Sequence, residues 1–128
     1  MRLALIPPLC RLDDCRLTDI QLVLPHMYKR SARYHDLMLE LQPSPMQTII
    51  LDNGAAEPEG MVHGEELIKV MRGLGPDEMA LPDILGYGDL TVDIADTFLA
   101  RWEYDIRLWG KRLGFVAQGK TLDEAKTQ

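Results

Sequence analysis

The sequence has few of the features that mark metal-binding and secreted proteins. Cys10 and Cys15 are its only cysteines, and two cysteines without a secretory leader indicate reduced thiols in a reducing compartment. A zinc site would need about two further ligands, and the three histidines, His26, His35 and His63, do not lie at the spacing of a zinc finger. We therefore expect no metal site in this chain.

Long apolar runs are also missing. No stretch approaches the roughly 20 apolar residues that a membrane helix needs. The opening MRLALIPP is too short and too broken by proline for a signal peptide. The sequence therefore predicts a cytoplasmic protein with no membrane partner.

Positive charge is scarce as well. The chain has 14 Lys and Arg against 20 Asp and Glu, which gives a formal net charge of -6. This balance disfavours strong nucleic-acid binding by the isolated chain, because phosphate contacts require clustered basic side chains. We interpret the two local basic clusters as solvated helix faces; they are Lys29, Arg30 and Arg33, and Arg101, Arg107, Lys111 and Arg112.

What the chain does have is the material for one hydrophobic core. Its 128 residues, 46% of them hydrophobic, predict a single domain that spans residues 1–128. Apolar runs predict four strands, at residues 20–26, 48–52, 78–83 and 113–118. A further short apolar run at residues 3–6 is stopped by two prolines, and we assign it to no element.

A helix is predicted after each strand. The first covers about residues 28–42, where apolar side chains recur at i, i+3, i+4 and i+7. The second covers about residues 65–75, and a long third helix begins with Asp89 or Thr91 as its cap. A fourth helix begins at the capping box that starts with Thr121. Strand and helix thus alternate four times, which predicts an α/β fold with parallel strands.

Each predicted strand ends in a polar residue. These residues are His26, Asp52, Asp83 and Gln118, and they recur at roughly the thirty-residue period of a βαβ unit. Crossovers between parallel strands are right-handed, so all four side chains are expected on one rim of the sheet. In α/β proteins this rim is where ligands bind.

Asp52 is the central candidate on that rim. The run 48–51 is apolar without alternation, which predicts a strand buried on both faces. Asp52 ends this run and is followed at once by the turn signal Asn53-Gly54. A carboxylate in this position is a candidate catalytic group. The alternative is a turn-forming aspartate whose carboxylate caps the backbone that follows it.

Three short motifs together resemble a known family. They are IILDNGAAE at residues 49–57, LPDILG at 81–86 and VAQGKT at 116–121. In their order and spacing they resemble the tRNA-guanine transglycosylases (queuine tRNA-ribosyltransferases), and they look most like the phage and bacterial relatives that insert 7-deazaguanines into DNA. The resemblance implies the N-terminal half of a TIM (β/α)8 barrel, with about four βα units and parallel strands.

The resemblance also implies roles for the rim residues. The position of Asp52 is that of the family's general acid/base, and Asp83 matches its base-recognising aspartate. A carboxylate can accept hydrogen bonds from the N1–H and exocyclic amine of guanine or a 7-deazaguanine, while a Gln amide can donate to O6. The implied substrate-binding residues are Asp83, Gln118, Gly119, Asn53, Gly54 and His26, although His26 receives no specific role.

The chain also departs from the family pattern. The family's nucleophilic aspartate and its zinc site lie beyond Gln128, so covalent catalysis by this chain alone is not supported and no cofactor is expected. Asn53 and Ala55 replace a Ser and a Gly of the tRNA enzymes, which points toward the relatives that act on DNA.

Three functions stay open from the sequence. The chain is part of a glycosyltransferase that exchanges guanine for a 7-deazaguanine in DNA or tRNA, or it is a non-catalytic base-binding half-barrel, or it is a different barrel enzyme. Four parallel strands cannot close a barrel. We therefore expect either self-association or a second half-barrel chain as partner.

Overall fold

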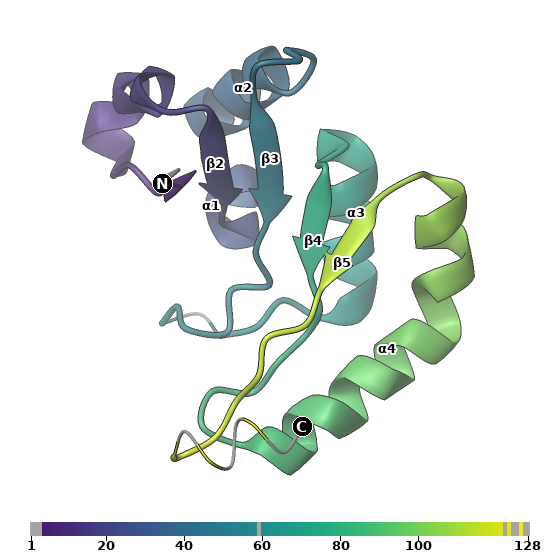
Figure 1. Ribbon diagram of the computed structural model, residues 1–128. Coiled ribbons are helices and arrows are strands. Elements are labelled where there is room, and N and C mark those ends of the chain that lie inside the picture. Colours follow the sequence, from purple (N-terminus) through teal and green to yellow (C-terminus); the bar gives the residue numbers. More distant parts are fainter. Residues whose placement is uncertain (1–3, 59, 122, 124–125, 127–128) are drawn as a thin grey trace.

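The computed structural model describes residues 4–58, 60–121, 123 and 126 of the chain. Five parallel strands form one sheet in the order of the sequence (Figure 1). The strands are β1 (Ala4–Leu5), β2 (Ile20–Val23), β3 (Thr48–Leu51), β4 (Glu78–Ala80) and β5 (Arg112–Gly114). The predicted α/β class with parallel strands is thereby confirmed, and the sheet has one strand more than predicted.

The helices follow the strands along the chain. They are the 3₁₀ helix η1 (Leu9–Leu17) and the α-helices α1 (Pro25–Arg30), α2 (Ala32–Leu41), α3 (Gly64–Leu74) and α4 (Gly88–Leu108). In the view of Figure 1, α1, α2 and α3 lie behind the sheet, and α4 runs along its side to reach β5. No helix in the described part of the chain combines the length and the apolar character that crossing a bilayer requires.

The two faces of the sheet differ in burial. In β3, Ile49 and Leu51 are fully buried, whereas Thr48 and Ile50 are partly exposed, and β2 alternates in the same way. Successive side chains of a strand point to opposite faces, so the buried set packs against the helices. The prediction that this strand is buried on both faces is therefore wrong, because in the described part of the chain one face of the sheet carries no layer of helices (Figure 1).

The first predicted strand and the first predicted helix have different bounds in the structure. Strand β2 ends at Val23, because Pro25 occupies the first turn of α1, where proline's fixed φ fits a helix start. The predicted helix at 28–42 is broken at Ser31, which has extended backbone angles and begins α2. Its Oγ accepts a hydrogen bond from the Tyr34 N–H at 3.2 Å. A serine that caps a helix in this way starts a new helix rather than continuing an old one.

The later strands also end earlier than predicted. Pairing between β4 and β5 stops after Leu81, whose N–H donates to the Gly114 carbonyl at 2.8 Å. Pro82 has no N–H to continue the ladder. Asp83 and Gln118 therefore lie on segments that follow the strands rather than on the strands themselves.

The observed helix ends agree only in part with those predicted from the sequence. Helix α3 starts with Glu65 and Glu66 in its first turn and ends at Gly75, which has a left-handed φ of 65°. The expected cap of α4 is wrong, because the helix begins after Tyr87 without a side-chain cap, and Thr91 lies inside it. The helix predicted from Thr121 involves residues that lie outside the described ones.

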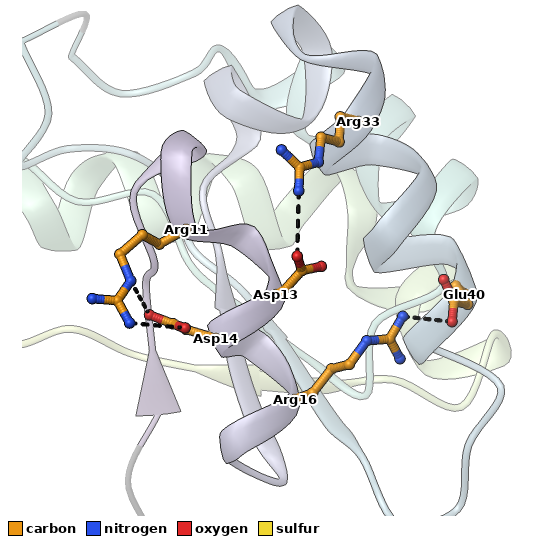
Figure 2. A network of polar contacts seen from close by, with 6 residues as sticks. All are labelled: Arg11, Asp13, Asp14, Arg16, Arg33 and Glu40. Atoms are coloured by element: carbon orange, nitrogen blue, oxygen red, sulfur yellow. Dashed lines mark hydrogen bonds and ion pairs between the residues drawn. The ribbon is translucent and has the colours of Figure 1, made fainter.

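Ion pairs attach the N-terminal 3₁₀ helix to α2 (Figure 2). Arg16 of η1 pairs with Glu40 of α2 at 2.7 Å, and Arg33 of α2 pairs with Asp13 of η1 at 3.5 Å. All four side chains are at least half exposed, so each pair stabilises the fold by at most about 1 kcal/mol. The apolar contacts of Leu12 and Cys15 with the core fix η1 more strongly.

The basic clusters of the sequence are solvated and largely paired with acidic side chains. Lys29 pairs with Glu66, Arg101 with Glu65 and Arg107 with Glu103. This arrangement leaves little free positive charge for phosphate contacts and agrees with the interpretation of both clusters as solvated helix faces.

The pairing at Glu66 gives a pH-dependent contribution to stability. Hydrogen bonds from Lys69 at 2.7 Å and Lys29 at 2.9 Å lower the pKa of Glu66 to about 2. A carboxyl group with a lowered pKa stabilises the fold above its ordinary pKa, and this stabilisation is lost as the pH falls toward 2. We therefore expect Glu66→Gln to flatten the acid side of the stability curve, measured by urea unfolding between pH 5 and about 2. A curve parallel to that of the unmodified chain would contradict this role.

Candidate functional site at the carboxyl ends of the strands

The polar residues singled out by the sequence gather at one edge of the sheet. Asp52 and Asn53 directly follow β3, Asp83 follows β4, and Gln118 follows β5. These three strands are neighbours and run parallel. Parallel strands present their carboxyl ends at the same edge, so the segments that follow them converge there.

Asp83 is the centre of this cluster. Only 4% of the residue is exposed. Its Oδ1 accepts a hydrogen bond from Asn53 Nδ2 at 2.5 Å, and its Oδ2 accepts one from Gln118 Nε2 at 2.5 Å. Both carboxylate oxygens therefore have an amide donor from a neighbouring strand end, which offsets much of the cost of burying a charge.

Asn53 holds Asp83 in place. It is 1% exposed, and its Nδ2 also donates to the Leu81 carbonyl at 2.6 Å. Its Oδ1 accepts from the Ala55 N–H at 2.8 Å, and its backbone carbonyl accepts from the Val62 N–H at 3.0 Å. An amide has two donor hydrogens, and both are used inside the protein. The geometry therefore makes Asn53 a support for Asp83, and the substrate contact that the resemblance implies for Asn53 stays a prediction.

Gln118 connects the segment after β5 to the turn before α4. Its Oε1 accepts a hydrogen bond from the Gly86 N–H at 3.1 Å while its Nε2 donates to Asp83. Nearby, Lys120 Nζ lies 5.7 Å from the centre of the Tyr87 ring. Residues 118–120 therefore lie alongside the turn at residues 84–88.

Asp52 lies at the same edge but takes part in a turn. Its Oδ2 accepts a hydrogen bond from the Gly54 N–H at 3.0 Å, and Gly54 has a φ of 81°, which glycine adopts without strain. This is the turn-forming geometry that the sequence left open as an alternative. In the described part of the chain, no hydrogen bond joins the Asp52 carboxylate to Asp83.

Two other predicted residues lie outside the hydrogen-bonded cluster. His26 lies in the first turn of α1, not at the end of a strand. Gly119 follows Gln118 on the irregular segment after β5. Among the described residues, neither of them donates a hydrogen bond to Asp83.

Thr91 is a supporting residue that the sequence analysis assigned to the wrong role. It is fully buried, and its Oγ1 accepts from the Ile84 N–H at 2.9 Å and donates to the Ile84 carbonyl at 3.2 Å. These two bonds fix the residue after Asp83 to helix α4. The signal was present in the spacing of Thr91, Ala95 and Phe98, which places the threonine on the buried stripe of α4.

A cleft lies near this cluster. Among the described residues, no group of three or more His, Cys, Asp or Glu side chains is placed to hold a metal ion. A cleft of about 400 Å³ lies between the start of α3 and α4, lined by apolar side chains that include Met61, Phe98 and Trp102. Pro82, beside Asp83, borders this cleft, but Asp52, Asp83 and Gln118 do not line it.

Comparisons with protein-family models, with curated proteins and with solved structures found no match for this chain.

Proposed function

We propose that this chain provides the base-recognition part of a glycosyltransferase that exchanges guanine for a 7-deazaguanine in DNA or tRNA. The observation that supports this proposal is the buried Asp83, held by amides from two neighbouring strand ends. A buried carboxylate at the ligand-binding edge of a parallel sheet is suited to recognise a planar ligand with adjacent N–H donors.

The hydrogen-bonding capacity of Asp83 fits a guanine edge. Each carboxylate oxygen accepts one hydrogen bond from the protein and has a second lone pair available. The N1–H and the exocyclic amine of guanine or a 7-deazaguanine are two parallel donors at matching separation. Gln118 can offer its Nε2–H to the O6 carbonyl, and Asp52, at the end of the adjacent strand, would serve proton transfer or orient the sugar.

The arrangement of the sheet is compatible with part of a (β/α)8 barrel. Consecutive parallel strands lie side by side in sequence order, with α1, α2 and α3 on one face. A barrel of about eight strands would need three more than the five seen here. Two copies of this sheet would supply ten strands, which is too many for that barrel. A different partner, or further sequence of the same protein, is therefore favoured over self-closure as the source of the remaining strands and of the nucleophile.

A base-binding module without catalysis is the second candidate. The observation that favours it is the hydrogen bond between Asp52 and the Gly54 N–H, because a carboxylate used in a turn need not act in proton transfer. The two functions differ in turnover. Release of labelled guanine from DNA or tRNA by the chain with its partner would support exchange, and base binding without release would support the module.

Asp83→Asn is expected to weaken the binding of 7-deazaguanine bases. The substitution places an amide donor against the donors of the base, which costs about 1–3 kcal/mol and corresponds to roughly 5- to 150-fold in the dissociation constant. Isothermal titration calorimetry measures this directly. Asp77→Asn is the matched control, because Asp77 accepts from the Ile49 N–H at 2.8 Å on the amino-terminal side of β4. Equal affinities of the two variants for the base would show that Asp83 does not contact it.

A further inference from the structure

Helix α4 carries a second stripe of residues beside the one that packs on the core. Its members follow one another at alternating spacings of four and three residues, and they are Leu90, Ile94, Thr97, Arg101, Tyr104 and Leu108. Leu90, Tyr104 and Leu108 are 49%, 78% and 70% exposed. This alternation is the heptad pattern by which one helix packs along another. Helix α4 therefore presents to solvent a face of the kind that a second helix covers.

The middle of this stripe borders the cleft between α3 and α4. Ile94, Phe98 and Trp102 line the cleft on the α4 side, and its volume is about 400 Å³. Tyrosine is a common anchor at interfaces, because its ring buries a large apolar area while its hydroxyl can stay hydrated. A chain that has both an exposed tyrosine and an apolar cleft on one face can pair with a second copy of itself, each copy supplying anchor and cleft.

Charge is distributed unevenly along α4. Residues 88–100 contain Asp89, Asp93 and Asp96 and no basic residue, whereas residues 101–112 contain four basic and two acidic ones. The helix dipole accounts for Asp89, which lies in the first turn, but its effect does not extend to Asp93 and Asp96. In the described part of the chain, no ion pair involves Asp93 or Asp96. The acidic half of the helix thus complements the basic half of a second, reversed copy.

We propose that α4 is the contact surface of a homodimer in which two copies of the chain pair their α4 helices in antiparallel orientation. The inference does not rest on the proposed function. Two reversed helices face each other with residues numbered symmetrically about the centre of the stripe, so Leu90 meets Leu108 of the second copy. Ile94 meets Tyr104 in the same way, which brings the tyrosine of each copy to the cleft of the other. Parallel pairing would set the two acidic halves side by side, and like charges disfavour it.

The same register brings Asp93 of one copy to Arg107 of the other. Each of these residues directly precedes a member of the stripe, Ile94 or Leu108, so both lie on the same flank of the helix. In an antiparallel pair, equivalent flanks face each other across the contact. Within its own chain Arg107 pairs with Glu103 at 2.6 Å, and its side chain is 75% exposed. Exposed pairs of this kind are weak, so Arg107 can also contact Asp93 of the second copy.

Removal of the tyrosine tests the contact. One helix from each copy makes a small interface, so we expect a reversible dimer whose population rises with concentration in sedimentation velocity. Tyr104→Ala should raise the dissociation constant at least tenfold, because it removes the aromatic anchor. Tyr87→Ala is the matched control, since Tyr87 is 54% exposed but precedes α4, and it should change nothing. A chain that stays monomeric at every concentration, or a dimer that Tyr104→Ala does not weaken, would overturn the inference.

A charge exchange tests the antiparallel register. Asp93→Arg and Arg107→Asp should each raise the dissociation constant about fivefold, because each replaces both symmetry-related pairs by like charges. The chain with both substitutions should return to the dissociation constant of the unmodified chain, since the pairs are restored with their signs reversed. Effects of the two substitutions within a single helix would add instead of cancelling. A double variant as weak as the single ones would overturn the antiparallel arrangement.

Discussion

Replacing Asn53 by leucine is expected to lower the free energy of unfolding by about 3–5 kcal/mol, the range for breaking a buried charge-assisted contact. Leucine is similar in size but supplies none of the hydrogen bonds that Asn53 makes to Asp83, Leu81 and Ala55. The carboxylate of Asp83 would remain buried with one of its two amide donors removed. Urea unfolding followed by circular dichroism measures the loss.

A double-mutant cycle with Asp83 shows where this loss originates. In an Asp83→Ala background the charge is gone, so Asn53→Leu should cost less than in the unmodified chain by about 1–3 kcal/mol. The remaining cost reports the bonds to Leu81 and Ala55. Equal costs in the two backgrounds would mean that Asn53 stabilises the loop alone and does not position Asp83.

Substitutions at Ile49 and Ile50 should differ sharply although they are neighbours in β3. Ile49 is fully buried against the helices, and Ile49→Ala should destabilise the chain by about 2–5 kcal/mol through lost burial and a cavity. Ile50 lies on the opposite, partly exposed face, and Ile50→Ala should cost about 1 kcal/mol or less. Each variant serves as the control for the other, because both replace an isoleucine of the same strand with alanine.

The Ile50 result also reports on association of the chain. A cost at Ile50 close to that at Ile49 would mean that the second face of the sheet is covered in solution. Sedimentation velocity at the same protein concentration would then show a species larger than the monomer. A small cost together with a well-folded monomer that binds no base and no partner would contradict both the assembly and the proposed function.

The polar edge of the sheet could be predicted because it depends on a simple rule of topology. Asp83 and Gln118 each follow a short apolar run, and the carboxyl ends of parallel strands meet at one edge whatever the details of the loops. That rule needs only the order of the elements. The hydrogen bonds among Asn53, Asp83 and Gln118 depend on loop conformations. Unlike helices and strands, loops have no periodic sequence pattern from which these hydrogen bonds could be predicted.

The errors in the predicted fold have local physical causes. The apolar run before Pro25 extends the predicted strand past it, whereas proline at that point favours the first turn of a helix. Ser31 lies inside the predicted helix but before its apolar stripe, which starts at Tyr34, and the capping role of Ser31 depends on the hydrogen bond that its hydroxyl accepts from the Tyr34 N–H. Strand β1 has two residues, too few for any pattern, and it is defined by its pairing with Ile20 and Gln21.

The hydrogen bonds at the carbonyl of Gly75 bear on how the sequence of this protein can vary in evolution. It accepts hydrogen bonds from Gln42 Nε2 at 3.0 Å and from Lys111 Nζ at 3.1 Å, so one backbone atom ties together the end of α2, the end of α3 and the start of β5. All of these lie at the end of the sheet opposite Asp83. Substitutions in the segments 53–63, 84–88 and 115–121 therefore leave this junction intact. The edge that carries Asp83 can therefore vary in sequence while the opposite end of the sheet keeps the fold.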